Sequence, residues 1–176
     1  EIMFGLNMIV HKGRTIFIGD TSVHEYPTSE QMAEIAISTA RVVRLFGFDP
    51  KVAFLSHSTF GEPATDRTKR LSDAVEILKK SKVDFKFDGE MQPDVALEEM
   101  YKELYPFSEI VGSSNVLIMP SQHSAAISYK MIKSMSRAKV IGPLLIGLGQ
   151  PIEIAPLRSS TSEILNLASI AAYSAD

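Results

Sequence analysis

The C-terminal third of the chain carries the residues best suited to binding an anion. A run of hydroxyl side chains from Ser159 to Ser162 comes immediately before an amphipathic segment that predicts a helix. Hydroxyls and free backbone amides at a helix N-terminus favour phosphate, a carboxylate or a developing oxyanion. One of these hydroxyls would also serve as an ordinary helix cap, with the others facing solvent. The pattern alone leaves both roles open.

Turns rich in Gly and Pro precede this run, and they extend the candidate site. In open α/β sheets, turns that follow strands and lead into helices are where anionic ligands bind. A polar residue also lies within the apolar part of the last predicted helix, where it either pairs locally or contacts a ligand. The candidate ligand-binding residues are Gly142, Pro143, Gly147, Leu148, Gln150, Pro151, Arg158, Ser160 and Asn166.

Two other segments place Ser and His residues close together. Ser56, His57 and Ser58 follow an apolar run, and Ser121 lies two residues before His123. Neither segment has the Gly turn or the third partner that a catalytic serine needs, so we interpret both as polar loops at strand ends. His57 follows a buried strand and is therefore a candidate for lining a cleft.

The sequence gives no pattern typical of a metal site. The four histidines have no ligand spacing, and the chain has no cysteine. Asp88, Glu90 and Asp94 are closely spaced, but we interpret them as a solvated turn. Gly147 and Gly149 form a fragment of a dinucleotide motif that lacks its third Gly and the helix after it, so this chain is not predicted to bind NADP.

Apolar runs that alternate with amphipathic segments must position these residues. Their spacing predicts βαβ units and a largely parallel sheet, and an N-terminal hairpin adds an antiparallel element. A capping box at Thr28 and Gln31 predicts the start of the first helix, and Gly47 predicts its end. Predicted strands are 3–10, 14–19, 51–55, 84–89, 115–120, 140–147 and 151–155; predicted helices after the first are 66–81, 93–105, 122–136 and 160–172.

Several motifs, in the right succession, resemble the C-terminal part of phosphotransacetylases. They are HKGRTIFIGDT at 11–21, the Tyr129-Lys130 pair, GPLLIGLGQP at 142–151 and SEILNLASIAA at 162–172. The resemblance covers essentially the whole chain but only the second half of such a protein. It implies a three-layer α/β sandwich with a mixed, mainly parallel sheet, of the isocitrate/isopropylmalate dehydrogenase-like phosphotransacetylase fold. It also implies two units, 1–155 and 156–176, the second packing on a preceding domain in complete family members.

The same resemblance exposes departures from the active members of the family. These carry a Ser-Arg pair before the last helix, and an ungapped alignment puts Pro156 and Leu157 at those positions. A Gly-Asn pair is replaced by Ala125-Ala126. Loss of a transition-state donor and a basic group removes orders of magnitude in rate. If activity remained, a shifted set of Arg158, Ser159 and Glu163 would have to supply it.

A module of this kind also ends the large NADP-dependent malic enzymes of bacteria, and the chain resembles that version most. The resemblance implies a non-catalytic domain that binds acetyl-CoA as effector, with NADP and a divalent metal held by upstream domains. The alternatives are an active phosphate acetyltransferase and a purely structural oligomerisation module. The family resemblance also implies a homodimer or higher homo-oligomer. The absence of an initiator Met before Glu1 leads us to expect a segment of a longer polypeptide.

Composition narrows the remaining possibilities. A hydrophobic content of 45% predicts a sizeable core, and a net charge of −3 argues against a nucleic-acid partner. We interpret the basic cluster of Arg67, Lys69 and Arg70 as the solvated face of a helix. No apolar run is long enough to predict a membrane span or a signal peptide. The lack of cysteine fits a cytoplasmic protein.

Overall fold

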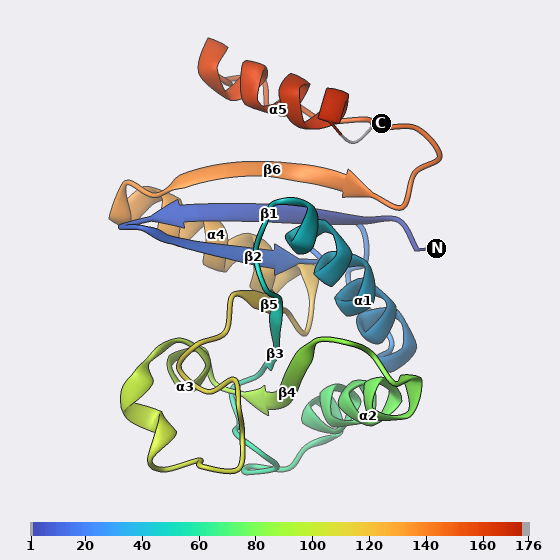
Figure 1. Cartoon of the computed structure of the whole chain (residues 1–176), viewed down its shortest axis with the longest axis vertical. Coiled ribbons are helices and arrows are strands. Elements are labelled where there is room, and N and C mark those ends of the chain that lie inside the picture. The colour runs from blue at the N-terminus through green and yellow to red at the C-terminus, as the bar shows by residue number, and fades with distance from the viewer. Residues whose placement is uncertain (1, 174–176) are drawn as a thin grey trace.

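The computed structural model describes residues 2–173, in which six strands form a single sheet with the order β4-β3-β5-β2-β1-β6. Strands β2 (Arg14–Gly19), β3 (Lys51–Leu55), β4 (Lys86–Met91) and β5 (Val116–Ile118) all run parallel. Strand β1 (Phe4–His11) is antiparallel to both β2 and β6 (Lys139–Ile146), so β6 points the same way as the parallel group. The predicted mixed, mainly parallel sheet is confirmed (Figure 1).

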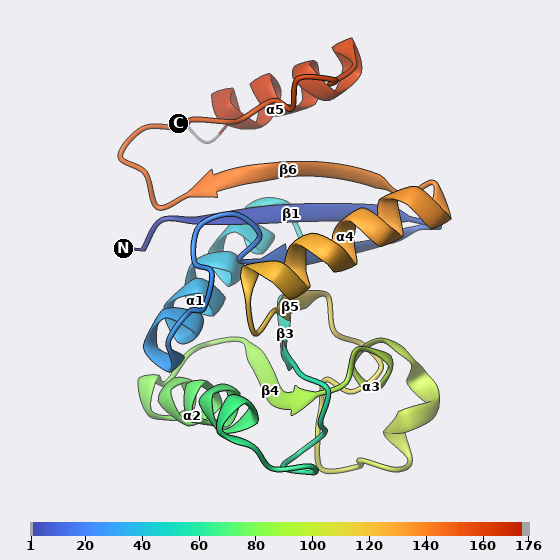
Figure 2. The same ribbon diagram turned by 180° about the vertical axis from the view of Figure 1, so that it is seen from behind.

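Helices cover both faces of this sheet and give the three layers (Figures 1 and 2). Helices α1 (Ser29–Leu45) and α2 (Asp66–Ser81) bury one apolar cluster against the sheet. Helices α3 (Pro93–Leu97) and α4 (Gln122–Ser136) cover the other face, where a second cluster forms. Side chains alternate along each strand between the two clusters, because successive residues of a strand point to opposite faces of the sheet.

The last helix, α5 (Thr161–Tyr173), lies outside this sandwich, along the outer side of β6 (Figure 1). Leu167 is the one residue of α5 that is buried in the part of the helix that the structure describes. Glu1 and residues 174–176, which belong to the predicted units 1–155 and 156–176, lie outside the described residues.

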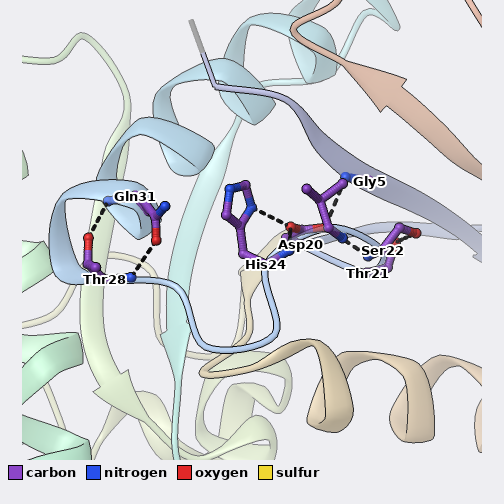
Figure 3. Close-up of polar contacts among 8 residues, drawn as sticks. Gly5, Asp20, Thr21, Ser22, His24, Thr28 and Gln31 are labelled. Carbon is purple, nitrogen blue, oxygen red and sulfur yellow. Dashed lines mark hydrogen bonds and ion pairs between the residues drawn. The ribbon is translucent and has the colours of Figure 1, made fainter.

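Local signals explain most element boundaries. The Thr28 hydroxyl accepts a hydrogen bond from the Gln31 amide at 3.2 Å, and the Gln31 side chain accepts one from the Thr28 amide at 2.8 Å (Figure 3). This capping box is the one predicted, and Gly47 ends the helix region with a φ of +82°. The hairpin at 11–14 and the strand at 51–55 are also confirmed.

Two predicted elements are wrong. The predicted helix 93–105 ends at Leu97 and continues only as a short 3-10 turn, Glu99–Lys102, because Glu98 adopts an extended conformation. The predicted strand 151–155 is reduced to one isolated bridge between Leu144 and Glu153. This bridge lies beside β6, the edge strand of the sheet, and the other residues of the segment form no further pairs with it.

Two buried carboxylates fix the loops at the carboxyl edge of the sheet. Asp20, 3% exposed, accepts hydrogen bonds from the backbone amides of Gly5, Ser22, Val23 and His24 and from the His24 ring at 2.7–3.1 Å (Figure 3). Saturating a buried carboxylate with amide donors compensates its desolvation. The loop after β2 is therefore held rigidly.

Glu90 is the second buried carboxylate, and it corrects the prediction of a solvated turn. Its side chain is 1% exposed and accepts hydrogen bonds from the Ser72 and Ser58 hydroxyls and the Gly61 amide. Burial acts to raise the pKa of Glu90, but these hydrogen bonds outweigh it and hold the pKa below its usual value. The loop after β3 is thereby tied to β4.

Candidate ligand sites around the sheet

The predicted ligand-binding residues divide between two cavities on opposite sides of β6. The first, the α5 cavity, has a volume of about 200 Å³ and includes Gly142, Pro143, Ser159 and Asn166. The second, the β6-turn cavity, has a volume of about 300 Å³ and includes Gly147, Leu148, Gln150 and Pro151. Arg158 and Ser160 lie outside both linings. The structure thus brings the predicted residues together in two groups.

The α5 cavity lies between α4, β6 and α5, and its charged groups are mostly basic. Tyr129, Lys130 and Lys133 of α4 line one wall, opposite Glu163 and Asn166 of α5. The Lys133 ammonium lies 3.4 Å from the Glu163 carboxylate, and this ion pair joins α4 to α5. Lys130 has no anionic partner among the described residues and is available to a bound anion.

Pro156 and Leu157 occupy different positions in relation to this cavity. Pro156 borders it, whereas Leu157 is fully exposed to solvent. Ser159 also lines the cavity, so the shifted catalytic set places Ser159 and Glu163 together there but leaves Arg158 outside. With apolar or missing groups at the two positions, the described cavity offers no paired hydroxyl and guanidinium.

Ser160 acts as a helix cap in this structure. Its hydroxyl accepts a hydrogen bond from the Glu163 amide at 3.3 Å, and the Glu163 carboxylate accepts bonds from the Ser160 amide and hydroxyl at 2.8 and 2.9 Å. Those bonds to Ser160, and then the Lys133 ammonium, lower the pKa of Glu163. Of the two roles that the hydroxyl run left open, Ser160 takes the cap.

The β6-turn cavity has a different electrostatic character, because its charged lining residue is acidic. Glu153 is half-buried there, and its Oε2 atom has no hydrogen-bond partner. Burial raises the pKa of Glu153 to about 7, while an interaction with the backbone of Leu145 acts against this rise. Near neutral pH this carboxyl is therefore only partly ionised, and its ionised form disfavours a phosphate in this cavity.

A third and larger cavity, about 670 Å³, lies at the carboxyl ends of β3 and β5. We call it the switch-point cavity, and Ser56, His57 and Ser121 line it, which confirms His57 as a cleft residue. The sequence did not predict that Arg67 and Arg70 belong here, because it assigned both to a solvated helix face. Their position in the first turns of a helix that follows a parallel strand is the signal that could have found them.

The neighbouring Ser and His residues do not form catalytic pairs. Ser58 donates a hydrogen bond to Glu90 at 3.0 Å and is completely buried. The Ser121 hydroxyl caps α4 by accepting a bond from the Ser124 amide at 3.3 Å. His123 stacks on Tyr26 and lies 3.7 Å from the Glu25 carboxylate. These contacts agree with structural roles at strand ends.

The described residues contain no group of three His, Cys, Asp or Glu side chains arranged to hold a metal ion. Among the helices of residues 2–173, none is both long enough and apolar enough to cross a membrane.

Comparison with known proteins agrees with the fold. A family model for phosphate acetyl/butaryl transferase matches residues 1–172. The chain is 46% identical to an NADP-dependent malic enzyme of Rhizobium meliloti over 98% of its own length, and this match spans 23% of that relative. It is 37% identical to a phosphate acetyltransferase of Clostridium acetobutylicum, over 88% of the chain and 47% of the relative.

Solved structures give the same result. A phosphotransacetylase from Streptococcus pyogenes superposes with a TM-score of 0.94 at 30% identity, covering 99% of this chain and 54% of that protein. EutD phosphotransacetylase from Staphylococcus aureus superposes with a TM-score of 0.92 at 29% identity, covering all of this chain and 55% of that protein. The chain thus spans about half of these enzymes and about a quarter of the malic enzymes. It belongs to the phosphate acetyl/butaryl transferase family.

Proposed function

We propose that this chain is a non-catalytic, phosphotransacetylase-like domain that senses acetyl-CoA on behalf of an NADP-dependent, oxaloacetate-decarboxylating malic enzyme. The observation that carries this proposal is the combination of a match to malic enzymes over 98% of the chain with Pro156 and Leu157 at the positions of the Ser-Arg pair. In the parent protein, upstream domains would hold NADP and a divalent metal and would oxidise malate.

The α5 cavity is the proposed place of contact with the effector. Lys130 offers a cation to a phosphate of CoA, and Asn166 and Tyr129 offer hydrogen bonds to its amide groups. A ligand in this cavity touches β6 and α4 on one side and α5 on the other. Ligand affinity is therefore linked to the position of α5, which is the differential contact that an allosteric effector needs.

We further propose that the chain self-associates as a homodimer or a higher homo-oligomer. Apolar side chains on the second half of α4 support this, because Met131, Ile132 and Met135 are all exposed. Large apolar patches on the surface are typical of interaction sites. Light scattering that gave a monomer mass at every concentration would argue against self-association.

The decisive experiment uses the full-length protein and follows malate-dependent reduction of NADP. We expect acetyl-CoA to inhibit this reaction, and we expect Lys130→Gln to weaken inhibition about tenfold, because a charge-assisted contact is lost. Lys80→Gln removes the same charge from an exposed position of α2 and serves as the matched control. Malate oxidation that does not respond to acetyl-CoA would contradict the proposal.

The second candidate function is an active phosphate acetyltransferase, which Ser159 and Glu163 favour because both line the α5 cavity. This enzyme would make acetyl phosphate from acetyl-CoA and phosphate. Acetyl phosphate formation that is abolished by Ser159→Ala would support the second function over the first.

A further inference from the structure

The switch-point cavity lies where two adjacent strands, β3 and β5, lead into helices on opposite faces of the sheet. From β3 the chain crosses through α2 to β4 on one side of the sheet, whereas from β5 it crosses through α4 to β6 on the other side. Strands β3 and β5 are hydrogen-bonded neighbours, so the two crossovers open a crevice beyond their carboxyl ends. Ligands of open α/β sheets bind in this kind of crevice.

Two arginines on adjacent turns of α2 bring positive charge to this crevice. The guanidinium of Arg70 is fixed by a 2.9 Å hydrogen bond from Nη2 to the Pro120 carbonyl at the end of β5. Its Nε atom is buried and has no hydrogen-bond partner. Arg67, three residues earlier, lines the same cavity and makes no ion pair or hydrogen bond with any described residue. Arg67 keeps all of its N–H donors for a ligand, and Arg70 keeps those of Nη1, which makes no hydrogen bond with a described residue.

The opposite wall adds further groups that favour an anion. Helix α4 begins at the cavity, and its N-terminus carries a partial positive charge. The N-cap residue Ser121 and the helix residues Ser124 and Ser128 line the cavity. The Ser121 and Ser124 hydroxyls bond to each other and within the cap, whereas Ser128 has no hydrogen-bond partner among the described residues. Asp66 is the lone carboxylate of the lining, so the arginines leave a net positive charge.

Much of the remaining lining is apolar. Leu55, Leu71 and Met119 are at most 6% exposed, whereas Tyr26 and Pro93, which also line the cavity, are exposed. A volume of about 670 Å³ matches the size of typical small-molecule sites. A hydrated inorganic ion alone would leave most of this surface unused.

From these observations we infer that the switch-point cavity binds a small organic anion, whose phosphate or carboxylate pairs with Arg67 and Arg70 and whose carbon body lies on Leu55 and Met119. This site shares no lining residue with the α5 cavity, so the inference is independent of the proposed acetyl-CoA site.

The test is a titration of the isotope-labelled chain, followed by NMR, with inorganic phosphate in one arm and pyruvate in the other. Chloride keeps the ionic strength constant in both arms, because weak anion binding is sensitive to screening. We expect saturable shifts in the amides of 56–57, 66–70 and 121–128. The arm with the lower Kd shows whether the arginines prefer the phosphate or the carboxylate group of the organic anion.

The variant Arg67→Gln should raise the Kd about tenfold, since it removes one charge-assisted contact from an exposed position that does not support the core. Lys69→Gln removes the same charge from the same helix outside the cavity and should leave the Kd unchanged. The inference is overturned by equal weakening in the two variants, by shifts confined to 129–133 and 139–167, or by no saturation with either anion through the millimolar range.

Discussion

The switch-point cavity and the α5 cavity are both candidate ligand sites, but the elements that form their walls differ in how firmly they are held. The walls of the first come from the centre of the sheet and from loops that Asp20 and Glu90 tie down. One wall of the second is α5, which buries Leu167 alone among its described residues, while α1 buries eight. Buried area is the main source of helix stability in proteins.

The first candidate site is therefore built as a preorganised cavity, and the second as an adaptable one. A preorganised cavity binds a small ligand without reordering. A bound ligand can change the position of a weakly packed helix, and low local stability is typical of elements that respond to effectors. The proposed regulatory role therefore belongs to the α5 side of the molecule.

Removing the carboxylate that holds the loop after β2 should cause the greatest loss of stability. Asp20→Asn should lower the free energy of unfolding by about 3 to 4 kcal/mol, because the new NH2 group cannot accept the bonds that Oδ2 takes from the His24 amide and the His24 ring, and the charge that strengthens the remaining bonds is lost. Chemical denaturation measures this. Asp84→Asn, which removes the charge of an exposed pair with Arg44, should leave the free energy of unfolding nearly unchanged. Equal losses in the two variants would mean that the loop is not rigidly held.

A pair of truncations sharpens the contrast between the two helices. Leu71→Ala in α2 should cost about 3 kcal/mol or more, whereas Leu167→Ala in α5 should cost about 2 kcal/mol, at the low end of the range for a buried leucine, since the rest of α5 packs loosely. Hydrogen exchange of the unmodified chain should be much faster in α5 than in α1. Comparable protection of the two helices would contradict the view of α5 as weakly held.

The free energy of unfolding should depend on pH through Glu153, which lines the β6-turn cavity. Its pKa is about 7 in the folded chain and 4.5 when exposed, so the folded state binds the proton more tightly. Stability is therefore fully present below about pH 4.5 and falls as the pH rises to about 7, by about 1 to 2 kcal/mol after screening of this half-buried group. Glu153→Gln should remove this fall, which denaturation at pH 5 and pH 8 measures. A variant that keeps the fall would show that another group titrates.

The smallest effect distinguishes capping from ligand binding at the start of α5. Ser160→Ala should cost about 1 kcal/mol or less of helix stability and leave acetyl-CoA binding nearly unchanged, because this hydroxyl faces Glu163. Ser159→Ala should do the opposite, since Ser159 lines the cavity. Calorimetric titration of both variants with acetyl-CoA gives the comparison, and a reversed result would assign Ser160 to the ligand.

Much of the fold could be predicted because its signals are local. The capping box at Thr28, the hairpin turn at 11–14 and the apolar run 51–55 each specify an element within a few residues. The failures at 93–105 and 151–155 are segments with weak local preference. An extended Glu98 ends the first, and the second forms a single bridge, from Glu153 to the edge strand β6. The candidate site was predicted as one set of residues, but the structure divides it.

By itself, the sequence determined the succession of most helices and strands along the chain, their approximate bounds and the family, because these depend on periodicity, caps and motifs that lie close together in the chain. Only the tertiary structure decided which distant residues share a cavity. In the sequence, Arg67 has the pattern of an exposed charge on a helix. In the structure, the parallel pairing of β3 with β5 brings α2 and α4 to one crevice, which Arg67 lines. Such proximity is set by strand order and crossover direction, and neither is encoded in any single segment.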